Sequence, residues 1–333
     1  MALYDNIIVP LDGSELSSHA LHPACLMAGI SGATLTLARA YDGIPVWHAD
    51  AEHGRFSSTM ALAEHDRITA FLTAEKGRLQ RMGVTTPVHV AVHEGPADEF
   101  IVALGNRHPG ALIVMSTHGR GGFSRLVMGS VTSRVVRSVV NPTLVVRGWG
   151  RGGTAVGKSL DNIIVPLDGS AFAEHALPHA GELARACGAQ LILVRSTHDT
   201  DYFRSHTQWT RLDGEGGFHF GGPAEMAASM AALSREYLWR KAEAMETQFG
   251  LSDVEAVNSR ENPADAVVEL AERSRNGLVV MATRGRRGVE RALLGSVADQ
   301  VVRRSPAPTL LVRGPMLTGD MTEVRRESEF AGV

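Results

Sequence analysis

Several features that would narrow the function at once are scarce in this sequence. Among 333 residues, Cys25 and Cys187 are the only cysteines, and no Cys/His spacing suits zinc, so neither a disulfide framework nor a structural metal site is expected. The formal net charge is only −3, with both signs spread along the chain, which gives no basic face for nucleic acid. The histidines show no short repeated ligand spacing, so no metal centre is predicted.

Targeting signals and long apolar runs are lacking as well. The N-terminal stretch MALYDNIIVPLDGS has no basic segment before a long apolar one. No window approaches the roughly eighteen uninterrupted apolar residues of a membrane span. Together with the scarcity of cysteine, these absences predict a cytoplasmic protein that does not enter a membrane.

The chain carries an internal repeat. DNIIVPLDGS occurs at 5–14 and again at 161–170, and TLVVRG at 143–148 returns as TLLVRG at 309–314. The later matches lie farther apart than the earlier ones, so the second copy has extra residues in its middle, around 198–226. A duplication of this length predicts two domains, each with its own core.

Strand-like and helix-like patterns alternate within copy one. NIIVPL is an uninterrupted apolar run that ends at Asp-Gly, as is typical of a buried parallel strand. The further strands predicted are TLTLARA, PVHVAVH, ALIVMST and TLVVR, and the predicted helices cover 14–30, 57–82, 97–107 and 130–140. This alternation predicts an α/β fold of two tandem doubly wound five-stranded parallel-sheet domains, with the ligand crevice at the carboxyl ends of the strands.

The glycine-rich stretch between the copies contains GGTAVGKS at 152–159, which satisfies the phosphate-loop pattern G-x-x-x-x-G-K-[ST]. Such a loop must open a helix, whereas the repeat places a strand after Ser159. We therefore interpret this stretch as a linker. The predicted division is domain one at 1–148, linker at 149–159, domain two at 160–315 and a C-terminal tail at 316–333.

A better candidate for a ligand site follows the fourth strand of each copy. STHGRGGFSRLVMGSV in copy one and ATRGRRGVERALLGSV in copy two each contain a glycine, nine further residues and then Gly-Ser. Gly119 and Gly285 would let the backbone approach a ligand, and Gly-Ser at 129–130 and 295–296 would open a helix whose N–H groups favour an anion. Alternatively, the serines cap the helices and the glycines only make turns. Recurrence of the whole arrangement favours a site.

The VPLDGS, HGRGGFSRLVMGSV, RGRRGVERALLGSV and TLVVRG/TLLVRG motifs resemble those of the universal stress protein family in its tandem-domain form, over nearly the whole chain. The resemblance implies a Rossmann-like, adenine nucleotide alpha hydrolase-like fold whose copies pair through their last strands as a pseudo-dimer that dimerises again. ATP-binding members of the family carry G-x-x-G-(nine residues)-G-[ST] after strand four, an aspartate near the ribose after strand one, and a backbone contact to adenine at the end of strand two. ATP, with or without Mg²⁺, is therefore the implied cofactor.

The resemblance assigns nucleotide-binding positions to both copies. In copy one they are Pro10, Asp12, Ala40, Ser116, His118, Gly119, Arg120, Gly122, Gly129, Ser130 and Val131. In copy two they are Pro166, Asp168, Ser196, Ala282, Arg284, Gly285, Arg286, Gly288, Gly295, Ser296 and Val297. Ser116 and Ala282 replace the first motif glycine, and a Cβ there would crowd the ribose or forbid a positive φ, although a small residue in an extended conformation would still offer its N–H.

Simpler interpretations exist for several of these residues. Aspartate before glycine is a routine turn former, which applies to Asp12 and Asp168. Arg120, Arg284 and Arg286 either pair with phosphates or are solvated loop residues.

Three functions follow from these alternatives. The first is an ATP-binding stress-response regulator whose nucleotide occupancy biases a surface read by an unknown protein partner. The second is a structural or interaction module without nucleotide, and the third is a slow ATPase. The sequence has no G-x-S-x-G elbow, H-E-x-x-H motif or paired carboxylates at helical spacing, so an enzyme is not expected and any hydrolysis would be slow.

Overall fold

The computed structural model describes residues 3–42, 51–117, 128–147, 159–197, 222–283 and 294–313, with backbone only at 51–60. The strands of copy one are β1 (Asn6–Pro10), β2 (Thr34–Tyr41), β3 (Val88–Glu94), β4 (Ala111–Ser116) and β5 (Thr143–Val146). Those of copy two are β6 (Asn162–Pro166), β7 (Gln190–Ser196), β8 (Val254–Ser259), β9 (Gly277–Thr283) and β10 (Thr309–Arg313).

Helices connect these strands in both copies. Copy one has α1 (Glu15–Ser18), α2 (Leu21–Ser31), α3 (Ala51–Arg81), α4 (Ala97–Arg107) and α5 (Ser130–Ser138). Copy two has the 3₁₀ helix η1 (Ala173–His175), α6 (Ala176–Cys187), α8 (Pro223–Phe249), α9 (Pro263–Arg273) and α10 (Ser296–Arg304). The predicted helix over 14–30 is thus two helices, and the one predicted over 57–82 begins earlier, at Ala51.

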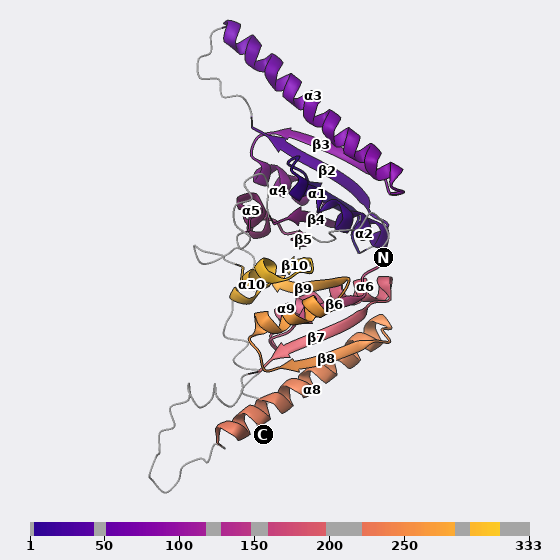
Figure 1. Ribbon diagram of the computed structural model, residues 1–333, viewed down its shortest axis with the longest axis vertical. Coiled ribbons are helices and arrows are strands. Elements are labelled where there is room, and N and C mark those ends of the chain that lie inside the picture. Colours follow the sequence, from indigo (N-terminus) through magenta and orange to yellow (C-terminus); the bar gives the residue numbers. More distant parts are fainter. Residues whose placement is uncertain are drawn as a thin grey trace, which may run out of the picture.

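The two copies share one sheet. Its strand order is β3-β2-β1-β4-β5-β10-β9-β6-β7-β8, and the five strands of each copy run parallel (Figure 1). Only the junction differs, because β5 and β10 pair antiparallel, with Leu144 opposite Leu310. The fold-class prediction is confirmed, and so is the pairing of the copies through their last strands.

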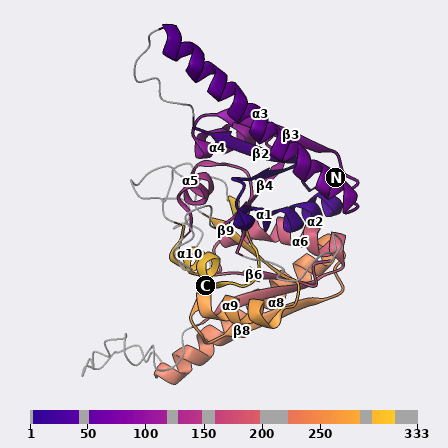
Figure 2. The same cartoon turned by 45° about the horizontal axis from the view of Figure 1, so that its top comes forward.

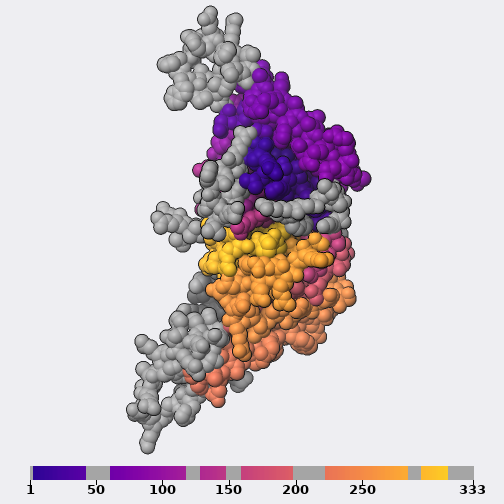
Figure 3. Space-filling model, viewed as in Figure 1, coloured from indigo at the N-terminus to yellow at the C-terminus, as the bar shows by residue number. Residues whose placement is uncertain are grey.

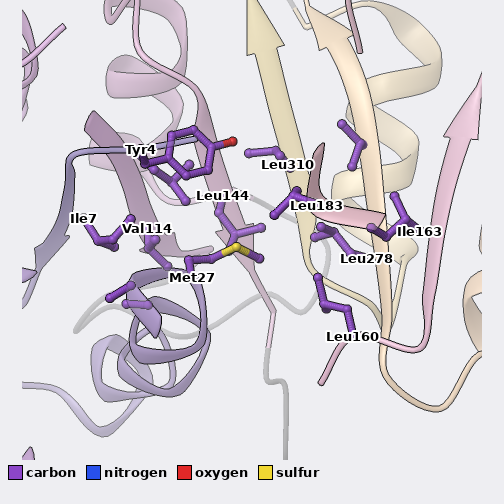
Figure 4. Packing of buried hydrophobic residues seen from close by; sticks show 14 of the residues in the cluster. Tyr4, Ile7, Met27, Val114, Leu144, Leu160, Ile163, Leu183, Leu278 and Leu310 are labelled. Carbon is purple, nitrogen blue, oxygen red and sulfur yellow. The ribbon is translucent and has the colours of Figure 1, made fainter. Parts of the chain in front are cut away.

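The prediction of two separate cores is wrong, because hydrophobic clusters on both faces of the sheet join residues of the two copies. The largest hydrophobic cluster includes Met27 and Leu144 of copy one together with Leu183 and Leu310 of copy two (Figure 4). Helices α2 and α6 lie side by side across the boundary (Figures 1 and 2), and in the space-filling view the copies form one body (Figure 3). On the other face, one cluster beneath α4 and α5 belongs to copy one alone, whereas the cluster beneath α9 and α10 of copy two also includes Met128, Val136 and Val145 of copy one.

A polar contact crosses the same boundary. The Tyr4 hydroxyl lies 3.2 Å from Nδ1 of His179, and the two rings are stacked with centroids 6.1 Å apart. Tyr4 is only 2% exposed, and burial raises its pKa, so its hydroxyl stays protonated. Burial also lowers the pKa of His179, which favours the neutral imidazole.

Lowering the pH below about 6.5 is expected to destabilise the protein through His179. In the unfolded chain this side chain titrates near its ordinary pKa of about 6.5, whereas burial holds its pKa lower in the folded state. The unfolded state therefore binds the proton first as the pH falls, and the free energy of unfolding drops as the pH is lowered from about 7.5 to about 5.5. Urea denaturation at about pH 7.5 and about pH 5.5 should show that the free energy of unfolding drops less in His179→Gln than in the wild type. An equal drop in both proteins would contradict this assignment.

Candidate functional site

The turn after the first strand of each copy brings the predicted aspartates to the carboxyl edge of the sheet. Asp12 Oδ1 accepts hydrogen bonds from the Ser14 N–H at 2.9 Å and from the Ser14 hydroxyl at 2.6 Å. Asp168 Oδ1 accepts the same pair from Ser170, at 2.8 and 2.6 Å. Each aspartate therefore does act as a turn former, and it does so through Oδ1.

An arginine that the sequence analysis missed lies against each of these turns. Gly13 has φ of +82°, and a Cβ built on it would come within 2.8 Å of Nη1 of Arg39, so both the conformation and the close approach require glycine. Arg39 is 8% exposed, and its guanidinium lies 5.3 Å from the centroid of the Phe71 ring. The signal was available, since LAR at 37–39 and LVR at 193–195 occupy the same place in the repeat.

Copy two repeats this arrangement with one addition. Arg195 approaches Gly169 and lies 5.0 Å from the ring of Tyr237, which stands where copy one has Phe71. The hydroxyl of Tyr237 donates a 2.9 Å hydrogen bond to Glu174, whose other carboxylate oxygen accepts one at 2.7 Å from Lys241. Burial raises the pKa of Tyr237, and Glu174 and Asp168 add to that rise. The Asp-Gly-Ser turn of copy two is thus linked through Arg195 and Tyr237 to η1 and α8.

Other predicted binding residues lie at or near the carboxyl ends of the strands. Pro10 and Pro166 end β1 and β6, and Ser116 ends β4. Ala40 in β2 and Ser196 at the end of β7 are half-buried at the same edge. No residue other than glycine has a positive φ in the described part of the chain, so Ser116 and Ala282 replace the motif glycine without backbone strain.

The N-terminal ends of α5 and α10 test the alternative that Ser130 and Ser296 only cap these helices. Gly129 and Gly295 occupy the N-cap positions of α5 and α10, with φ of −55° and −50°. Ser130 and Ser296 are the first helical residues, and neither helix has a side-chain capping bond. The interpretation that these serines cap the helices is therefore wrong. The half-buried valines that follow, Val131 and Val297, are the remaining predicted contacts here.

Hydrogen bonds at the two helix starts differ. In copy one the Gly129 N–H donates to the Thr117 carbonyl at 2.5 Å, and the Thr132 hydroxyl donates to the Ser116 carbonyl at 2.9 Å. In copy two, Ala298 stands in the place of Thr132 and has no hydroxyl. Within the residues that the structure describes, the Gly295 N–H donates to no acceptor.

Several predicted positions lie outside the described residues. They are His118, Gly119, Arg120, Gly122, Arg284, Gly285, Arg286 and Gly288. Most of the GGTAVGKS stretch lies outside them as well, but Ser159 is followed by the strand β6 and not by a helix, which confirms that the stretch is no phosphate loop.

The described residues contain neither a cluster of potential metal ligands nor a membrane-spanning helix. Their His, Cys, Asp and Glu side chains form no group of three or more that could hold a metal ion. None of their helices is both long enough and apolar enough to cross a bilayer.

Comparisons with known proteins agree on one family. The sequence model of the Universal stress protein family matches residues 3–147 and 159–313. A universal stress protein of Mycolicibacterium smegmatis is 24% identical over 92% of this chain and 96% of its own, and one of Methanocaldococcus jannaschii is 28% identical over 46% of this chain and 82% of its own. The crystal structure of a universal stress protein from Archaeoglobus fulgidus superposes with a TM-score of 0.61 at 18% identity, covering 93% of this chain and 98% of that one.

Proposed function

The chain belongs to the universal stress protein family, and on that premise we propose that it binds ATP at the carboxyl edge of its sheet and acts as a stress-response regulator. Nucleotide occupancy would bias a surface that a protein partner reads, so that binding, rather than turnover, is the output. The observation that carries the proposal is that the predicted parts of the site meet at one edge of the sheet. Because β1 and β4 are adjacent and parallel, the Asp12 turn and the α5 start that follows β4 come to the same edge, and β6 and β9 do this in copy two.

The residues at this edge fit an adenine nucleotide. Asp12 and Asp168 would bind the ribose or a Mg²⁺ ion held by the phosphates, and the backbone of Ala40 and Ser196 would contact adenine. The N–H groups at the start of a helix favour the phosphates. A bound ATP would bring negative charge and bulk to this edge and so alter the surface that a partner reads.

The first experiment is to denature freshly purified full-length protein and to quantify the released nucleotide by chromatography. The same measurement follows incubation with MgATP and removal of the excess. We expect adenine nucleotide at no more than two per chain. If neither sample released any, ATP binding would be rejected and the nucleotide-free module would take its place.

Valine at both Gly129 and Gly295 is expected to weaken ATP binding at least tenfold, because a branched side chain would occupy the space of the phosphates. The fold should tolerate the change, since the φ angles are ordinary and a Cβ on Gly295 meets no atom within 4 Å. The matched control is Gly222→Val. Gly222 is the N-cap of α8, with φ of −59° and equally open space. Calorimetric titration should give the wild-type affinity for this control; unchanged affinity in the double variant would refute the site.

A second candidate function is an interaction module, favoured by the antiparallel pairing of β5 with β10 that fuses the copies. In this case the chain would act through its surfaces and would associate further as a homodimer. Light scattering of purified protein tests the homodimer, and a purely monomeric protein would exclude it. Phosphate release under multiple turnover would separate the slow ATPase from both other functions.

A further inference from the structure

The two copies are not equally prepared for a phosphate. In copy one the Gly129 N–H is engaged by the Thr117 carbonyl at 2.5 Å, so this donor points at the end of β4. The Thr132 hydroxyl fastens the first turn of α5 to the Ser116 carbonyl at 2.9 Å. A ligand that used the Gly129 donor would have to break its bond and would leave a carbonyl oxygen beside its own negative charge.

Among its described residues, copy two lacks the two hydrogen bonds that fasten the helix start to the strand end in copy one. Ala298 is 4% exposed and packs among apolar residues where copy one has Thr132, so no side-chain hydroxyl ties the first turn of α10 to the end of β9. Within the described part of the chain the Gly295 N–H has no acceptor. This donor lies at the positive end of the helix dipole and is available to an anion.

A second, independent difference concerns the long helix beside the aspartate turn, which is α3 in copy one and α8 in copy two. In copy two Tyr237 and Lys241 of α8 both bond to Glu174 of η1, at 2.9 and 2.7 Å. In copy one Phe71 lacks the hydroxyl, and Glu75, in the place of Lys241, pairs with Arg78 of its own helix at 2.8 Å. The aspartate turn of copy two is thus held in place before a ligand arrives, which reduces the ordering cost of binding.

We propose that copy two is the nucleotide-binding copy of this chain and that Thr132 closes the corresponding helix start in copy one. This inference rests on the proposed function and adds which of the duplicated sites serves it. Copy one then contributes its share of the common sheet and core, and Thr132 and Ala298 are the residues that set the difference.

The test is calorimetric titration of the full-length protein with MgATP. The wild type should bind close to one ATP per chain. Gly295→Val should remove that binding, Gly129→Val should lower the affinity far less, and the control Gly222→Val should leave both stoichiometry and affinity unchanged. Two equal sites, or loss of binding in Gly129→Val alone, would overturn the inference while leaving ATP binding by the protein intact. No binding in any protein, the wild type included, would overturn the proposed function itself.

Exchanging the two determining residues sharpens the test. Ala298→Thr should close copy two and weaken ATP binding about tenfold, the amount expected for one competing hydrogen bond. Ala298→Val adds nearly the same volume without a donor, so it should bind ATP as the wild type does. Conversely, Thr132→Ala should open a second, weaker site in copy one. Equal weakening by Thr and Val at 298 would mean that packing, not the hydroxyl, decides, and would reject the role given to Thr132.

Discussion

Leu310→Ala is expected to lower the free energy of unfolding by about 3 kcal/mol, and to do so for both copies at once. Leu310 is fully buried in β10, lies opposite Leu144 of β5 and belongs to the cluster that includes residues of both copies. Truncating it removes apolar burial and leaves a cavity at the centre of the shared face. Since no boundary in the packing separates copy one from that cavity, the loss should reach both copies.

Urea denaturation followed by circular dichroism gives the size of this loss, and hydrogen exchange read by mass spectrometry shows where it falls. Exchange should accelerate together in β4 of copy one and β9 of copy two. Leu62→Ala is the control, because Leu62 is 66% exposed on α3 and should change stability by less than about 0.5 kcal/mol. Acceleration confined to copy two would show that the copies unfold independently in spite of their common cluster.

The fold was largely predictable because its determinants are local or repeated. Short apolar runs such as NIIVPL, bounded by turn residues, are typical of strands covered on both faces, and β1 is buried along nearly its whole length. The duplication then transferred every element of copy one to copy two. The split at 14–30 was not visible, because the helical pattern continues through it. It arises where the N–H groups of His19 and Ala20 bond three residues back, to the carbonyls of Leu16 and Ser17, and so interrupt the regular α-helical pattern.

The site was predictable only as positions along the backbone. Asp12 was assigned from its place after a strand, but the packing of Arg39 on Gly13 depends on two residues from different strands coming within contact distance. The bond from Thr132 to the Ser116 carbonyl likewise joins a helix to a strand end. Contacts of this kind form only when the strands and helices come together at the carboxyl edge of the sheet. They can therefore differ between two copies that carry similar sequence motifs. The merging of the cores has the same origin, because it follows from the β5–β10 pairing rather than from either copy alone.

Asn141 provides copy one with a polar anchor that copy two lacks. Its side chain is 5% exposed, and Nδ2 donates to the carbonyls of His108 at 2.8 Å and Ala111 at 3.2 Å. Gly105 on α4 makes room for it, since a Cβ at Gly105 would lie 2.7 Å from Oδ1 of Asn141. The repeat places Ala307 where copy one has Asn141, and α9 has Ala271 two residues before its end, as α4 has Gly105.

Asn141→Ala is therefore expected to cost about 2 kcal/mol, because it removes the hydrogen bond to the buried Ala111 carbonyl and opens a gap beside Gly105. Gly105→Ala alone should also destabilise, since the clash with Asn141 outweighs the gain in helix propensity of up to about 1 kcal/mol. Combined, however, the two changes reproduce the alanine pair of copy two. Truncating Asn141 removes the shortest contact of a methyl group at 105, which then occupies part of the gap, while Val139 and Ile113, at 3.0 and 3.2 Å, need to shift only slightly. Urea denaturation of the wild type, the two single variants and the double variant should show that the double variant is more stable than Asn141→Ala. The effect of Gly105→Ala on the free energy of unfolding would then be unfavourable beside Asn141 and favourable in the Asn141→Ala variant. Additive losses would show that the two positions do not share this space.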